Sequence, residues 1–201
     1  MTVLNLSQHL IVNPQDRVLW DFAGIDGQWV ARHLFGDIAV QIAPFQSASV
    51  VLPERPSPEV CGSLLRLCEA NYRVELPAAI DLSRIVGMLK AKVWIKVSSL
   101  TPVKGSAGSA RSLEAQPDAK GRMAMLIVPD EWGCTHIPRL ATTKPLYSLH
   151  PLPLERAAPA RIDDKAVLIW RHQWNGKSCF QIQTAEKDKE AIATILGDRL
   201  D

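Results

Sequence analysis

Residues 166–184 read AVLIWRHQWNGKSCFQIQT, and they decide the fold of this chain because they contain its clearest β-hairpin. Asn175-Gly176 is a favoured pair for a two-residue turn in which both residues need a positive φ. Side chains alternate between the two faces of a strand, so such a turn also determines which residues share a face. The expected cross-strand pairs are Trp174 with Lys177, His172 with Cys179, Trp170 with Gln181, and Leu168 with Gln183.

The two faces of this hairpin differ in chemistry. One is apolar and belongs against the core, with Arg171 near the tip where its charge reaches water; its residues are Val167, Ile169, Phe180, Ile182 and Thr184. The other carries aromatic rings, a cation and amides, namely Trp170, His172, Trp174, Lys177, Cys179, Gln181 and Gln183. Rings that stack on bases and a cation that approaches phosphates suit single-stranded nucleic acid, a function that requires this face to lie in solvent. The alternative is that the final helix or a proline-rich segment covers it.

Upstream of the hairpin, residues 18–53 are expected to form an antiparallel meander. Asp26-Gly27 divides two apolar runs as a hairpin turn would, and Ile38, Val40 and Ile42 alternate as in a strand. A helix at 29–35, capped by Gly36, is the alternative for the second run. The other expected elements are helices at 57–73, 81–92 and 186–200 and strands at 93–97 and 122–129.

Strands followed by helices without regular alternation predict an α+β fold, with hairpins and about three helices packed on a sheet. We expect a single domain over residues 1–201. Residues 99–121 lack periodicity and are rich in Ser, Gly and basic residues, which predicts a long irregular loop that is mobile or orders on a partner. Six prolines in 129–161 predict an extended strap over the surface instead of a long helix.

The positive charge of the chain is concentrated in its middle. Lys+Arg against Asp+Glu is 5 against 8 in residues 1–80, 10 against 5 in 81–150, and 8 against 8 in 151–201. A local basic region attracts phosphate or an acidic partner even where the net charge is only +2. We therefore predict a non-catalytic nucleic-acid-binding protein, or a subunit of a nucleoprotein complex, whose contact residues are Lys90, Lys92, Lys96, Lys104, Arg111, Lys120, Arg122, Trp170, His172, Trp174 and Lys177.

Two other functions compete with this prediction. The exposed hairpin and the long loop would equally serve a protein–protein subunit of a larger assembly, because Trp and Arg anchor such interfaces. An enzyme or metal protein is the third hypothesis. His172 beside Cys179 could form a thiolate–imidazolium pair, and Cys134 and His136 are zinc-ligand types, although a closed zinc site needs four ligands.

The remaining expectations concern the cellular setting. The N-terminal stretch has no basic residues before its apolar run, and no segment reaches the ~18 apolar residues of a membrane span. The four cysteines, Cys61, Cys68, Cys134 and Cys179, lack a CxxC spacing and are expected to be free thiols. We expect a cytoplasmic protein with no cofactor, no bound metal and no membrane contact.

Overall fold

The computed structural model describes residues 11–12, 17–52, 62–99, 123–144, 147–174 and 176–198. Its elements form an α+β fold of two antiparallel sheets with helices, which confirms the predicted fold class. The strands are β1 (Ile11–Val12), β2 (Arg17–Ala23), β3 (Ser47–Val50), β4 (Gly62–Arg66), β5 (Asn71–Pro77), β6 (Trp94–Ser99), β7 (Met123–Pro129), β8 (Ala141–Thr143), β9 (Arg156–Ile162), β10 (Lys165–Trp174) and β11 (Lys177–Ala185). The helices are α1 (Gly27–Phe35), α2 (Ile38–Gln41), α3 (Ser83–Met88), α4 (Asp130–Leu140), α5 (Lys189–Asp198) and the 3-10 turn η3 (Glu186–Asp188).

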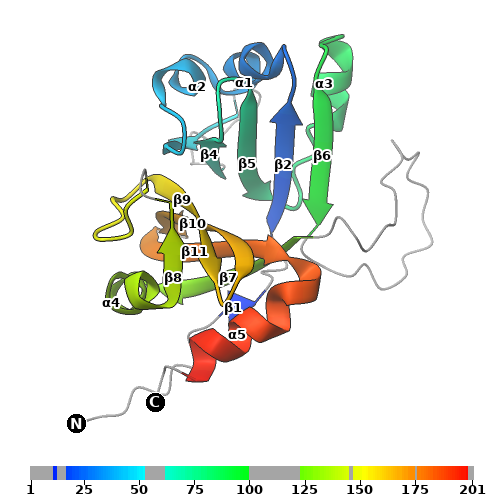
Figure 1. Cartoon of the computed structure of the whole chain (residues 1–201). Coiled ribbons are helices and arrows are strands. Elements are labelled where there is room, and N and C mark those ends of the chain that lie inside the picture. Colours follow the sequence, from blue (N-terminus) through cyan, green and yellow to red (C-terminus); the bar gives the residue numbers. More distant parts are fainter. Residues whose placement is uncertain are drawn as a thin grey trace, which may run out of the picture.

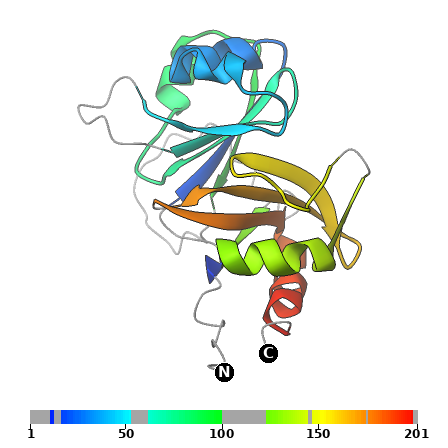
Figure 2. The same cartoon turned by 90° about the vertical axis from the view of Figure 1, so that its left-hand side faces the viewer.

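The two sheets are stacked between two helical layers. We call the sheet ordered β3-β4-β5-β2-β6 the upper sheet and the one ordered β1-β7-β11-β10-β9-β8 the lower sheet. Helices α1, α2 and α3 lie on the outer side of the upper sheet, and α4 and α5 lie beyond the lower sheet (Figures 1 and 2). Each sheet therefore has one face toward helices and one face toward the other sheet.

Strand alternation supplies a separate apolar cluster on each helical face. On the upper sheet, Val18, Trp20 and Phe22 of β2 join buried side chains of α1. On the lower sheet, Val167 and Ile169 of β10 join residues of α4 and α5. Burial of apolar area on this scale is the main favourable contribution to folding. The faces between the sheets carry two smaller clusters and most of the buried polar side chains.

The final hairpin forms with the predicted register, and strands at 93–97 and 122–129 are confirmed as β6 and β7. The helix predicted from Asp81 is confirmed as α3, although it is shorter. Helix α1 replaces the expected 18–35 hairpin, so the alternative was correct, and Gly36 follows it with φ 77°. The reason is the spacing of the apolar residues, because Val30, Ala31, Leu34 and Phe35 recur as on one face of a helix and are buried.

Three other predictions are wrong. Residues 38–41 form α2 instead of a strand. Within the predicted 57–73 helix, the described residues form β4 and the start of β5, because both faces of these strands are covered and their apolar residues need not alternate with polar ones. The 129–161 segment is not a strap, since it contains α4, with Pro138 inside the helix, and strands β8 and β9. The predicted loop lies outside the described residues, apart from Ser99 at the end of β6.

Candidate interaction surface

The aromatic face of the final hairpin is buried, as the alternative held, and it does not lie in solvent as nucleic-acid binding through this face would require. Trp170, His172 and Trp174 are 0%, 1% and 9% exposed. Neither the final helix nor a proline strap covers them. The upper sheet does so, with Leu65 against Trp170 and Leu19 against Trp174. Strand alternation correctly assigned these residues to one face. The element that covers this face is a second sheet, which is built from residues far away in the sequence.

Hydrogen bonds join the two sheets at this interface. The Nε1–H of Trp170 donates to Ser47 Oγ at 2.9 Å, and that hydroxyl donates to Glu155 at 2.6 Å. The ring of His172 stacks on Trp170 with centroids 4.1 Å apart. Its Nε2 donates to Gln181 Oε1 at 2.5 Å, which leaves Nδ1 to accept from Ser63 at 3.4 Å. These bonds satisfy polar groups that would otherwise be costly to bury.

His172 and Cys179 face each other as predicted, but they do not form an ion pair. Burial, the largest cause, lowers the pKa of His172 to about 4, with the Gln181 hydrogen bond opposing it. Burial likewise raises the pKa of the Cys179 thiol to about 12. Both groups are therefore neutral at pH 7, whereas an activated cysteine requires a thiolate. The arrangement favours a structural role for the pair.

Cys134 and His136 lie on the one helix α4 and engage separate partners. The thiol of Cys134 is 4.0 Å from Asp130 Oδ2, and the ring of His136 stacks on Trp132. Asp130 holds Arg171 through two hydrogen bonds of 2.8 Å, so Arg171 does not reach into water as expected. In the part of the chain that the structure describes, no three His, Cys, Asp or Glu side chains are grouped as metal ligands would be.

The structure describes only some of the cationic residues that we predicted to contact nucleic acid. Lys90, Lys92 and Lys96 lie between α3 and the middle of β6. Lys177 is exposed at the tip of the β10–β11 hairpin, in the other sheet. Lys104, Arg111, Lys120 and Arg122 lie outside the described residues. The three lysines near β6 therefore form the part of the predicted binding site that the structure brings together.

An exposed apolar edge that the sequence analysis missed is formed by β6 and the segments next to it. We call it the β6 surface, and its apolar side chains have exposed fractions of 82% for Ile25, 63% for Met88, 64% for Trp94 and 44% for Val97. Ile25 is in the turn after β2, Met88 ends α3, and the other two belong to β6. These elements stand together at one side of the upper sheet (Figure 1).

Backbone contacts join the β2–α1 turn to the start of β6. Trp94 pairs with Ala23 across β2 and β6, and a Cβ on Gly24 would lie 2.9 Å from the carbonyl oxygen of Lys92. The backbone N–H of Lys92 donates to the Asp26 carboxylate at 2.6 Å, which ties the β2–α1 turn to the start of β6. The one sequence signal was the set of lysines at 90, 92 and 96, because lysine is common on edge strands.

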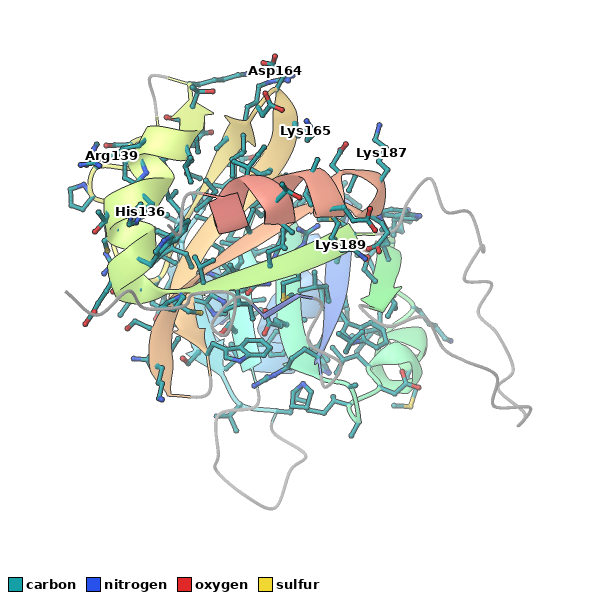
Figure 3. The ribbon with its side chains drawn as sticks, turned by 90° about the horizontal axis from the view of Figure 1, so that it is seen from below. His136, Arg139, Asp164, Lys165, Lys187 and Lys189 are labelled. Carbon is teal, nitrogen blue, oxygen red and sulfur yellow. The ribbon has the colours of Figure 1, made fainter. Side chains whose placement is uncertain are left out.

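A second surface feature is an open cleft of about 560 Å³ at the β9–β10 turn and η3. Asp164 comes from the turn and Lys165 begins β10, while Lys187 comes from η3 and Lys189 begins α5 (Figure 3). Arg161 donates to the backbone carbonyl of Asp164 at 2.5 Å, and Lys165 pairs with Asp163 at 3.1 Å. Because these cations are held by the turn itself, the cleft is a weaker candidate than the β6 surface.

Comparison with known proteins supports the fold and nothing finer. No protein-family model matches the sequence, and no curated protein matches it either. Among solved structures, the glycine cleavage system aminomethyltransferase T from Bartonella henselae is similar, with a TM-score of 0.62 and 13% sequence identity. The match covers 96% of this chain and 46% of that one, so the chain spans about half the length of that structure. No helix among the described residues is long and apolar enough to cross a membrane.

Proposed function

We propose that this protein is a non-catalytic subunit of a larger assembly and that it binds a partner protein through the β6 surface. The observation that carries the proposal is Trp94, a large aromatic residue of β6 that is 64% exposed. Tryptophan is among the residues that contribute most to protein interfaces, and clustered exposed apolar side chains mark interaction sites.

The proposal includes the cytoplasm as the compartment. Cys68, Cys134 and Cys179 are free thiols, and Cys68 and Cys134 are exposed. Exposed free thiols persist in reducing compartments and are oxidised in secreted proteins. Fractionation of cells that express the tagged chain tests this part, and we expect the tag in the cytoplasmic fraction.

The main test compares two surface variants of the tagged chain. Trp94→Ser with Met88→Ser removes the exposed apolar centre of the β6 surface. Trp29→Ser is the control, since Trp29 is also half exposed but stacks on His33 on the outer side of α1. We expect cross-linking and mass spectrometry to recover the same stoichiometric partner with wild type and control and to lose it with the double variant. Equal recovery with all three proteins would contradict the proposal.

Binding of single-stranded nucleic acid remains the second candidate. Trp94 lies between Lys92 and Lys96 along the chain, which would combine base stacking with phosphate contacts. This function predicts binding of a labelled oligonucleotide whose affinity falls steeply with salt, as phosphate-dominated binding does. Trp94→Ser should weaken it. We favour a protein partner because Ile25, Met88 and Val97 give apolar area that bases and phosphates do not need.

A further inference from the structure

β6 is the last strand of the upper sheet, and β2 is its one neighbour among the described strands. In an antiparallel strand, alternate residues aim their backbone N–H and C=O groups away from the neighbour. An edge strand therefore presents a row of groups that an incoming strand can pair with. The backbone of β6 is thus a second element of recognition, distinct from the side chains of the β6 surface.

Both faces of β6 offer side chains to such an incoming strand. By its register with β2, Val97 lies on the same face as Trp20, toward the helices. Trp94 and Lys96 lie on the opposite face, where their neighbours across the pair are Ala23 and Asp21. Trp94 and Val97 remain exposed because no described strand lies beyond β6. An added strand would cover apolar area on both faces.

The charge of this edge selects the partner. Residues 88–99, MLKAKVWIKVSS, carry three lysines and no acidic residue. Lys96 lies on β6 and Lys90 and Lys92 precede it, so pairing between two copies of this edge would bring like charges together. The same lysines attract an acidic strand, since complementary charge speeds association and excludes wrong partners. An acidic extended segment with alternating apolar residues therefore suits this edge better than a second copy does.

We propose that β6 accepts an extended acidic segment of the partner protein as an additional strand of the upper sheet. This inference rests on the proposed function and specifies the chemistry of the partner. The segment supplies backbone hydrogen bonds to the β6 edge, apolar side chains on the face of Val97, and carboxylates near Lys96 on the opposite face and near Lys92. The test also distinguishes two other molecules that could bind β6, namely a second copy of this chain and a polynucleotide.

A synthetic peptide of five Val-Glu repeats tests this inference on the full-length protein. We expect binding by calorimetry, weakened by salt, and slower hydrogen exchange of the amides in 94–99. A peptide of five Val-Lys repeats should bind at least tenfold more weakly. A Val-Glu peptide N-methylated at every second residue cannot complete the strand pairing and should lose binding. Equal binding of the methylated peptide, or no protection of β6, would overturn strand addition.

Matched charge reversals locate the peptide. Lys92→Glu should weaken the Val-Glu peptide about fivefold, a typical effect of one exposed charge pair. Lys177→Glu, on the exposed tip of the lower sheet, should leave binding unchanged. Equal effects of both variants would show nonspecific attraction and overturn the inference. If the partner is still lost with the Trp94 and Met88 variant while no peptide binds β6, the proposed function stands and strand addition fails. Self-association seen by sedimentation would show that a second copy, and not an acidic segment, occupies β6. Displacement of the peptide by an oligonucleotide would show that the occupant is a polynucleotide.

Discussion

Single residues at the sheet interface have protonation states that follow from burial. The pKa of His172 is lowered to about 4, below the 6.5 of an exposed histidine. Between these values the unfolded chain binds a proton that the folded chain rejects, so the free energy of unfolding falls as the pH is lowered from 6.5 to 4. The full loss for this group is roughly 3 kcal/mol, reached near pH 4 and constant below it.

Urea denaturation at several pH values between 4 and 7 measures this loss. We expect His172→Gln to remove most of the pH dependence of the free energy of unfolding that His172 causes. His33→Gln is the control, because His33 is exposed, and it should leave that pH dependence in place. The prediction is wrong if the wild type and His172→Gln lose stability in parallel over this range.

Cysteine reactivity is the second prediction at this scale. Burial raises the pKa of Cys179 to about 12 and leaves its thiol 5% exposed, whereas Cys68 and Cys134 are exposed. Thiolates react with iodoacetamide and thiols do not, so labelling of the folded protein at pH 8 should modify Cys68 and Cys134 and spare Cys179. Peptide mass mapping reads this out, with urea-unfolded protein as the fully labelled reference. Labelling of Cys179 in the folded state would show that the sheets separate.

At the scale of elements, α4 packs against the lower sheet through a glycine. A Cβ at Gly133 would lie 2.1 Å from Cδ2 of the buried Phe180, so Gly133→Ala must displace either the Phe180 ring or the helix. We expect a loss of roughly 1–3 kcal/mol in the free energy of unfolding. Gly197→Ala in α5 is the matched control, because a Cβ added there would meet nothing within 4 Å. That substitution should be neutral or stabilise by up to about 1 kcal/mol. Similar results for the two variants would refute the close packing of α4.

For the whole molecule, a buried ion pair of the upper sheet is hydrogen-bonded to the lower sheet through Gln183. Arg73 of β5 donates to the Asp21 carboxylate at 2.6 and 2.8 Å and also to Gln183 Oε1 of β11. The Arg73 and Asp21 side chains are 10% and 14% exposed, against 60% and 66% for the surface pair Arg32 and Asp37. Arg73→Met should cost about 3 kcal/mol because it leaves Asp21 buried without its partner.

Arg32→Met breaks the surface pair and should cost less than about 1 kcal/mol. Adding Asp21→Asn to Arg73→Met should recover part of the loss, since it removes the orphaned charge. Chemical denaturation followed by tryptophan fluorescence measures all four proteins. Equal costs for the two arginine variants would mean that the interface between the sheets is hydrated and weakly coupled.

Local pattern was sufficient for the last hairpin. Its register follows from a two-residue turn, and its faces follow from alternation, so Trp170, His172 and Trp174 were correctly assigned to one face. The α+β class followed similarly from the arrangement of strands and helices. The β4 and β5 region was misassigned as a helix, because a strand covered on both faces has the continuous apolar character that also suits a helical stripe.

The sequence by itself determined elements whose geometry depends on neighbours along the chain, such as turns, strand register and the faces of β10 and β11. Tertiary structure alone decided which face meets water. The upper sheet buries the aromatic face, and all its strands except β6 lie more than 90 positions away from Trp170 in the sequence. Because β6 is the last strand of that sheet, Trp94 is left exposed. Burial is set by what packs across a face and by the order of strands, and both depend on contacts between distant segments that no local pattern encodes.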